Sequence, residues 1–323
     1  MAEPAPSLPP HLVFVLIKPD AVIAGKTPAL LAALHTAGLR IAAWQPVTRP
    51  HESQFEELYR FNLAKRALGA EPVGWWLNRR LYTLGESLAL LLQMPDAHAD
   101  AAAHMTALKG PSHPWLCQPG QLRHTFCASN LAMNLIHSSD DAAATTREAR
   151  LFGEPVQWQG ALPGLEAADL RAQAEALDAR HRQALAAIGR WRERRADLHP
   201  VRVAARCALR VLAPGPTLPP QPAQVLRGLL ACDDAALQRD RDACWAALEA
   251  VATHLHADSD DARCRAAWTF LRERQIDWTR MQAQLDACRQ QAAGPGAWEA
   301  LVLLSTAYHR RAMFPLPAAD GDA

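Results

Sequence analysis

The sequence has little of what marks membrane, secreted or nucleic-acid-binding proteins. It contains no uninterrupted apolar run of the roughly 18 residues that a transmembrane helix needs, which argues against a membrane partner. Its 34 basic and 33 acidic residues leave a formal net charge of +1, so no overall basic field attracts nucleic acid. The first residues have neither a positive segment nor an apolar segment, so residues 1–10 predict a short disordered leader rather than a signal peptide.

The cysteines also lack a functional pattern. There are seven of them, an odd number, without a CxxC pair or zinc-finger spacing, so we predict no protein metal site. Without an export signal they are expected to be reduced, mostly buried small side chains, which predicts a cytoplasmic location. The length of 323 residues, with 50% hydrophobic and 21% charged residues, suits two ordinary globular domains.

The first half of the chain alternates between strand and helix patterns. Val13–Ile17 is a compact apolar run typical of a buried strand, and Leu39–Trp44 and Ser87–Gln93 resemble it. Thr27-Pro28 opens a helix that Gly38 ends, and residues 51–59 predict another short helix. This alternation indicates an α/β or α+β domain in which helices cover one sheet.

The second half is rich in helix-forming residues from about position 165 onward. Leu170, Leu177, Ala184 and Trp191 recur every seven residues and predict a long amphipathic helix. A proline-rich stretch over residues 213–222 must interrupt the helices on either side of it. The other helices are expected at residues 201–212, 223–232, 235–256, 261–290 and 298–313.

Glycine and proline cluster between Gly153 and Gly164, where we place the boundary between the two halves. The expected organisation is therefore a first domain over residues 11–155, a linker over residues 156–164 and an all-α domain over residues 165–323. The helical domain has no ligand or catalytic spacing among its His, Cys and Trp residues. Binding of a protein partner or formation of a homo-oligomer is its default role.

Four segments of the first half occur in a recognisable order. They are Lys18-Pro19-Asp20 after the first strand, Leu108 to Pro114, Pro119 to Phe126, and Asn134-Leu-Ile-His137-Ser-Ser-Asp140. In this order and at these separations they resemble the nucleoside diphosphate kinase family over about residues 10–155. The resemblance implies a ferredoxin-like α/β sandwich with an antiparallel sheet. It also implies a histidine, here His137, that carries a phosphoryl group between two nucleotides.

The resemblance assigns roles around this histidine. Glu148, eleven positions further on, matches the carboxylate that orients the family's histidine, and Ser139 matches a serine that contacts that carboxylate. A phosphoryl carrier needs one free imidazole nitrogen and a partner for the other, which suits this set. The alternative for Glu148 is a solvated helix residue beside Arg147.

The resemblance also supplies a set of nucleotide-binding residues. Phosphoryl transfer relies on cations and hydrogen-bond donors around the phosphates, and an arginine fork suits paired phosphate oxygens. Each of these residues also has a plain alternative as a surface ion pair, a turn residue or, for Trp75, a packing residue. The implied contacts are Lys18 with the phosphates and ribose, Arg123 and Ser112 with phosphates, Tyr59 near the histidine, Asn134 with the ribose and Trp75 with the base.

The sequence also departs from the family pattern. Ala21 and Ser138 replace usual glycines, and His124 stands where a glycine is common. Thr106 occupies the place of a second phosphate-binding arginine, a charge that Lys109 nearby is a candidate to supply. The interval from Phe126 to His137 is one residue longer than the usual family spacing. These changes make reduced or redirected activity credible.

Three functions follow for testing. The first is a nucleoside diphosphate kinase with ATP as phosphate donor, nucleoside di- and triphosphates as partners, and Mg²⁺ bound through the nucleotide phosphates. The second is a nucleotide-binding regulatory or interaction protein that signals through the helical domain. The third is a phosphotransferase with a non-nucleotide acceptor.

Overall fold

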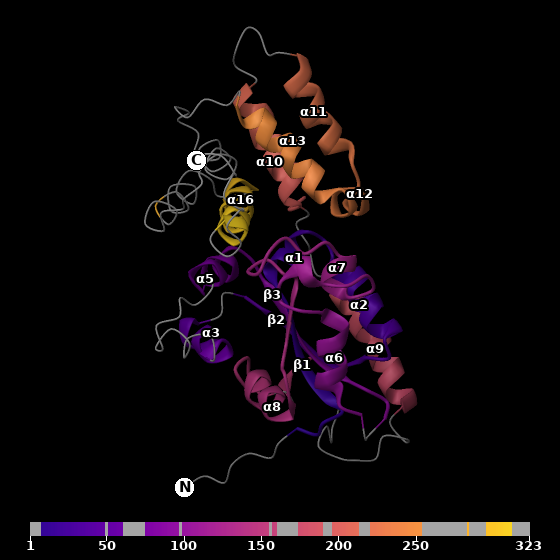
Figure 1. Ribbon diagram of the computed structural model, residues 1–323. Coiled ribbons are helices and arrows are strands. Elements are labelled where there is room, and N and C mark those ends of the chain that lie inside the picture. Colours follow the sequence, from indigo (N-terminus) through magenta and orange to yellow (C-terminus); the bar gives the residue numbers. More distant parts are fainter. Residues whose placement is uncertain are drawn as a thin grey trace, which may run out of the picture. The chain divides into compact units, whose positions relative to one another are not determined.

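The structure, a computed structural model, describes residues 8–48, 51–60, 75–96, 99–154, 157–159, 174–189, 196–212, 220–253, 283 and 295–311 (Figure 1). The chain divides into two compact units. The sheet unit comprises residues 1–128 and 134–195, and the helical unit comprises residues 129–133 and 196–323. Five residues, 129–133, therefore belong to the helical unit although the rest of that unit begins only at residue 196.

The sheet unit is built on four antiparallel strands in the order β2-β3-β1-β4. Each residue of β1 and β3 is buried, because these strands have a neighbour on both edges and helices on both faces. This strand order is that of a ferredoxin-like sandwich, so the expected fold class is confirmed. The strands are β1 (Leu12–Ile17), β2 (Arg40–Val47), β3 (Ser87–Gln93) and β4 (Ile136–Ser138).

Helices cover both faces of this sheet, on opposite sides in Figure 1. Val13, Val15 and Ile17 pack with apolar residues of α2 and α6, whereas Leu12, Phe14 and Leu16 pack with those of α3, α5 and α8. Alternate residues of a strand point to opposite faces, so the continuous apolar run of β1 serves both layers. The helices are α1 (Pro19–Ile23), α2 (Thr27–Thr36), α3 (Glu52–Leu58), α5 (Trp75–Leu84), α6 (Ala101–Lys109), α7 (Leu122–Thr125), α8 (Ala142–Arg150), α9 (Ala174–Ile188) and the 3₁₀ turn η1 (Pro114–Leu116).

Local sequence signals account for much of this unit. The three predicted strands appear within three residues of their expected bounds, and β3 has the predicted bounds. Helix α2 ends before Gly38, whose φ of +88° is a left-handed conformation. Nothing lies within 4 Å of a Cβ placed there, so the backbone angle rather than space favours glycine.

Helix α9 differs from the expected division of the chain. It lies in the range assigned to the helical domain, yet Ala184 and Ile188 belong to the core around β1 and α2. His181 Nδ1 also accepts a hydrogen bond from the backbone N–H of Ile41 in β2 (3.1 Å). The sheet unit extends to Arg195, about 40 residues beyond the predicted end at 155, because the apolar face of α9 is buried against its edge.

The helical unit contains only helices among the residues that the structure describes, as expected of an all-α domain. The helix expected over residues 235–256 is broken at Asp240, and the helix expected over residues 261–290 lies outside the described residues except for residue 283. In the described parts of the chain, no helix has both the length and the apolar composition that crossing a membrane requires. The helices are α10 (Pro200–Leu212), α11 (Pro220–Ala231), α12 (Asp234–Arg239), α13 (Arg241–Ala252) and α16 (Pro295–Arg311).

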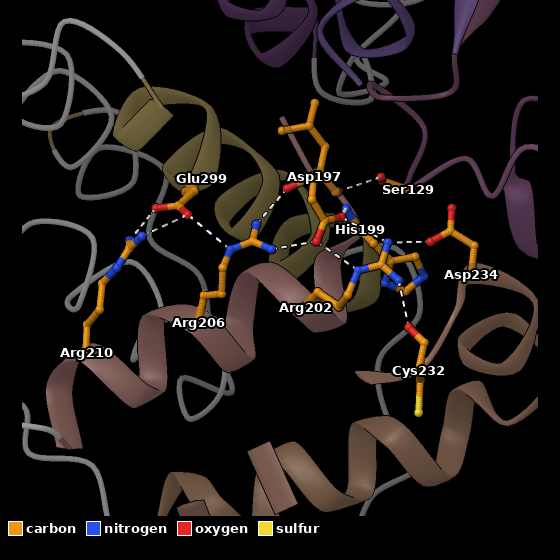
Figure 2. Close-up of polar contacts among 10 residues, drawn as sticks. Ser129, Asp197, His199, Arg202, Arg206, Arg210, Cys232, Asp234 and Glu299 are labelled. Carbon is orange, nitrogen blue, oxygen red and sulfur yellow. Dashed lines mark hydrogen bonds and ion pairs between the residues drawn. The ribbon is translucent and has the colours of Figure 1, made fainter. Parts of the chain in front are cut away.

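Helix α10 carries an arginine every four residues, and this row of charges ties the helical unit together (Figure 2). Arg202 pairs with Asp197 (2.8 Å) and with Asp234 of α12. Arg210 pairs with Glu299 of α16 (2.6 Å). Residues four apart share one helix face, so one side of α10 is paired with both α12 and α16.

Candidate active site

The turn after β1 holds the backbone just before β4. The backbone N–H of Lys18 donates to the carbonyl of Leu135 (2.9 Å), and the carboxylate of Asp20 accepts from the N–H of Leu135 (2.9 Å). Leu135 has a φ of +72°, a conformation that costs a non-glycine residue free energy. The hydrogen bonds of its N–H and its carbonyl hold Leu135 in this conformation, two residues before His137.

His137 lies in β4 opposite Leu16, on the sheet face that α3, α5 and α8 cover. Its ring is half-buried between Phe14 and Tyr59, with ring centroids 6.3 and 5.6 Å away. Its Nε2 lies 2.8 Å from the carboxylate Oε2 of Glu148. Among the contacts of the described residues only Nε2 is engaged, so Nδ1 is the nitrogen available to a substrate.

Glu148 is fixed by more than the histidine. The Ser139 hydroxyl donates to the same Oε2 (2.8 Å), and Arg147 Nη2 donates to Oε1 (2.9 Å). Burial by itself raises the pKa of Glu148, but the hydrogen bond and charge of His137, with Ser139 and Arg147, outweigh it and lower that pKa. Glu148 therefore remains a carboxylate beside the imidazole at neutral pH.

Two tyrosines lie beside the histidine. The hydroxyls of Tyr59 and Tyr82 are 2.9 Å apart, and burial raises the pKa of both phenols. Both therefore stay neutral hydrogen-bonding groups rather than anions. Tyr59 thus lies near the histidine, as the sequence resemblance implies, while its hydroxyl is held by Tyr82.

Lys18 extends from the end of β1 to the same region. Its Nζ donates to the side-chain oxygens of Asn134 (3.0 Å) and Asn78 (3.2 Å), and lies 5.8 Å from the centroid of the Tyr82 ring. Burial lowers the pKa of Lys18 to about 8. Asn134 in turn donates to the carbonyl of Ser112 (3.2 Å), so Lys18 and the Ser112 loop meet at one asparagine.

Arg123 is buried and braces the loops around these residues. Its guanidinium donates to the carbonyls of Gly110 (2.6 Å), Ile136 (2.8 Å) and Asn134 (3.2 Å). Three of the five N–H donors of an arginine are thus directed at backbone, which leaves two for another acceptor. Burial lowers the pKa of Arg123 to about 10, so it remains a cation at neutral pH.

Lys109 lies on the face of β4 opposite to His137. Its Nζ donates to the hydroxyl (2.7 Å) and the carbonyl (3.2 Å) of Ser138. Ser138 pairs with Val15 and His137 with Leu16, so their side chains leave β4 on opposite faces. Lys109, the candidate to replace the arginine missing at Thr106, therefore contacts the residue after His137. Burial lowers the pKa of Lys109 to about 8.

The geometry brings most of the predicted site residues together. Two groups of contacts, one of Lys18, Asn134 and Arg123 and one of Tyr59, His137, Ser139 and Glu148, are joined by Tyr82, which meets both Lys18 and Tyr59. Ser112 joins it through its carbonyl, while its side chain is exposed. Trp75 is the first residue of α5, and its side chain lies outside the described part of the structure, so base stacking stays a prediction.

Sequence reasoning missed Asn78, Tyr82 and Asp20 as members of this site. Asn78 and Tyr82 lie four residues apart on α5 and so share the face that meets Lys18. That spacing was visible, but nothing in the sequence pairs α5 with β1. No group of three or more His, Cys, Asp or Glu side chains suited to a metal ion occurs among the residues that the structure describes.

Comparisons with known proteins match this half of the chain. Residues 12–157 match the family model described as "Nucleoside diphosphate kinase". A nucleoside diphosphate kinase of Deinococcus radiodurans is 30% identical over 139 residues, which are 43% of this chain and 91% of that protein. One of Thermus thermophilus is 31% identical over 142 residues, 44% of this chain and 94% of that protein. A crystal structure of an apo nucleoside diphosphate kinase from Encephalitozoon cuniculi aligns with a TM-score of 0.39 and 24% identity, over 46% of this chain and 92% of that one.

Proposed function

This chain belongs, through its N-terminal half, to the nucleoside diphosphate kinase family, and from that premise we propose that it moves the terminal phosphoryl group of a nucleoside triphosphate to a nucleoside diphosphate. The proposed carrier is His137. The contact of Nε2 with Glu148 is the observation that supports it most. Because Nε2 faces this carboxylate, the lone pair of Nδ1, on the other side of the ring, points away from Glu148.

The proposed reaction has two steps. The Nδ1 lone pair attacks the terminal phosphorus of ATP, forming an N–P bond while the P–O bond to the β-phosphate breaks and the electron pair leaves with ADP. A β-phosphate oxygen of a second nucleoside diphosphate then attacks the same phosphorus and the N–P bond breaks. Nε2–H remains hydrogen-bonded to Glu148 throughout, so the carboxylate stabilises the positive charge that the ring acquires.

The proposed nucleotide contacts involve two buried cations, Lys18 and Arg123, whose positive charge burial destabilises. Burial lowers the pKa of Lys18 and of Arg123, which means that the free site disfavours their positive charge. A phosphate chain relieves that cost, and Mg²⁺ enters with it as part of the substrate. We assign Lys18 and Arg123 to phosphates, Asn134 to the ribose, Ser112 to a phosphate and Trp75 to the base.

A labelling experiment tests this function. The protein is incubated with ATP labelled in its γ-phosphate and Mg²⁺, quenched, and examined for protein-bound label that is lost in acid and kept in alkali. Adding GDP or CDP should then move the label to the triphosphate. A protein that binds ATP and stays unlabelled contradicts the proposal. Label that no nucleoside diphosphate accepts supports a non-nucleotide acceptor instead.

The second candidate is a nucleotide-binding regulatory protein, and the contacts of Arg123 favour it. Three backbone carbonyls engage this guanidinium, and Thr106 supplies no second arginine. On this reading ADP and ATP bind with measurable affinity while label never reaches His137.

We place the protein in the reducing cytoplasm. The described cysteines Cys117, Cys127, Cys207, Cys232 and Cys244 are free thiols, the form that a reducing compartment maintains.

A further inference from the structure

The segment Ser129–Met133 belongs to the helical unit, although Ala128 before it and Asn134 after it belong to the sheet unit. It lies inside the interval between Phe126 and His137. The chain thus visits the helical unit for five residues and returns directly to the candidate nucleotide site. We call this segment the clamp loop.

The clamp loop is closed on itself. The backbone N–H groups of Ser129 and Asn130 both donate to the carbonyl of Met133 (2.9 and 3.3 Å). The side-chain oxygen of Asn130 accepts from the N–H groups of Ala132 (3.0 Å) and Met133 (2.9 Å). These bonds make the loop a compact turn whose two ends are fixed relative to each other.

The other end of the Asn130 amide holds the loop to α16. Its Nδ2 donates to the hydroxyls of Ser305 (2.9 Å) and Thr306 (3.1 Å), about 175 residues further along the chain. Asn130 and Ser305 are 0% exposed and Thr306 is 1% exposed. Met133 is also fully buried, with its sulfur 3.5 Å from the Ser305 hydroxyl. A buried amide that lost these hydroxyls would be left without partners for its donors, so the loop is strongly held.

The residue that follows the clamp loop is central to the nucleotide site. Asn134 binds Lys18 through its side-chain oxygen, Ser112 through its side-chain nitrogen and Arg123 through its carbonyl. His137 lies three residues further on. The backbone from Asn134 to His137 is therefore held at Leu135 by Asp20, and the clamp loop directly precedes it in the chain.

We propose that Asn130 is a positioning residue and that α16, through the clamp loop, sets the placement of Asn134 and hence the affinity of the site for nucleotides. The proposal rests on the proposed nucleotide-binding function. It gives α16 a role in the reaction, because the contacts of Ser305 and Thr306 restrain the clamp loop, whose backbone continues directly into Asn134.

The test uses the full chain and changes the α16 side of the clamp. In the double variant Ser305→Ala, Thr306→Val both hydroxyls are lost, while the bonds inside the clamp loop remain. We expect the dissociation constant for ADP, measured by calorimetry, to rise about three- to tenfold, the equivalent of one neutral hydrogen bond. The KM for the nucleoside diphosphate should rise by the same factor while kcat changes less. Adding Asn130→Ala should weaken binding no further than Asn130→Ala does alone.

A destabilised helical unit provides the matched control. Leu248 is 0% exposed in α13, and the clamp contacts do not involve it. Leu248→Ala should lower the melting temperature and leave the dissociation constant for ADP unchanged, which separates positioning from a merely structural role. The proposal would be overturned if Leu248→Ala raised the dissociation constant for ADP as much as the double variant does at the same loss of melting temperature. It would also be overturned if the effects of Asn130→Ala and the double variant on that constant were additive.

Hydrogen exchange separates failure of the clamp from failure of the proposed function. If the wild-type protein binds no ADP, the nucleotide assignment is wrong, but exchange at the amides of residues 135–138 still reports the clamp. These amides should exchange at least threefold faster in the double variant than in wild type and at the wild-type rate in Leu248→Ala. Unchanged exchange in a folded double variant overturns the inference.

Discussion

The imidazole Nε2 of His137 lies 2.8 Å from Oε2 of Glu148, and this contact decides which ring nitrogen can react. A carboxylate only accepts hydrogen bonds, so Nε2 must carry the proton and Nδ1 the lone pair. Because Ser139 and Arg147 hold the same carboxylate, the tautomer does not depend on the histidine alone.

Replacing His137 by alanine should abolish acid-labile labelling by ATP, since the other nucleophile beside Glu148, the Ser139 hydroxyl, could form only an acid-stable phosphate ester. The variant should still bind ADP with a dissociation constant close to that of wild type. Rapid quenching with γ-labelled ATP measures the first quantity and calorimetry the second. Wild-type turnover in this variant would place the chemistry elsewhere in the chain.

Glu148→Gln should slow phosphoryl transfer by about 10²- to 10⁴-fold, the usual range for groups that manage a proton or its charge. Glutamine can still accept the Nε2–H but no longer stabilises a positive ring. ADP binding should change little, because Glu148 faces the histidine rather than the Lys18 side of the site. Arg147→Met is the control, since it removes a hydrogen-bond partner of Glu148 while Glu148 keeps its negative charge. A slower rate in Arg147→Met than in Glu148→Gln would contradict this assignment.

Thr106→Arg should tighten nucleotide binding by about tenfold or more, because a charge-assisted contact to phosphate contributes about 1.5–3 kcal/mol. Thr106 is exposed on α6, and Lys109 is engaged behind β4, so the added cation has no competitor there. Ala107→Arg, on the next exposed position of the same helix, adds the same charge in another direction. Equal tightening in both variants would show a general charge effect instead of a specific contact.

The sequence predicted the central strands of the fold well and its edges poorly. The run from Leu12 to Ile17 is apolar at every position because both faces of β1 are covered, and such a run is easily recognised. β4 has three residues, too few to show a period, although it carries His137. Helix α9 has an ordinary amphipathic pattern that does not say which surface it covers, which is why the sheet unit extends beyond the predicted boundary.

The candidate site was predictable where it depends on residues in motifs, such as His137 and Glu148. It was not predictable where it depends on distant packing. Asn78 meets Lys18 across 60 residues, and Asn130 meets α16 across 175. An asparagine carries no local signal of its partner, because its two hydrogen-bonding ends accept many neighbours.

The stability of the sheet unit should fall in mild acid because of His181. Burial first, and electrostatic repulsion from the neighbours His35 and Arg40 next, lower the pKa of His181 to about 4 from an ordinary 6.5. The unfolded chain therefore binds a proton below about pH 6.5 that the folded chain refuses until about pH 4. The stabilising effect of the neutral ring is complete above pH 6.5 and is lost as the pH falls through this window.

Thermal unfolding of wild type and His181→Asn at pH 7.5 and pH 5 measures this loss. Asparagine offers an oxygen to the Ile41 N–H and does not titrate. The melting temperature of wild type should therefore fall more between the two pH values than that of the variant. Parallel falls would assign the acid sensitivity to other groups.

Nucleotide binding should weaken above about pH 8 because of Lys18. Burial lowers its pKa to about 8, so the free protein loses this positive charge as the pH rises through that value. ADP, which needs the charge, should bind at least about tenfold more weakly at pH 9.5 than at pH 7, the loss of one charge-assisted contact. Calorimetric titration across this range measures it.

Deprotonation of Lys18 should have the opposite effect on folding stability. A loss of ADP binding at alkaline pH can therefore be told apart from a loss of folded protein caused by Lys18. An unfolded Lys18 keeps its proton up to about pH 10.5, so between pH 8 and 10.5 the unfolded state binds more protons and Lys18 makes folding more favourable as the pH rises. Lys109 also has a pKa lowered to about 8, but it contacts Ser138 on the other face of β4. Lys109→Met should therefore keep the alkaline loss of ADP binding and Lys18→Arg should remove it, and the reverse result would assign the phosphate contact to Lys109.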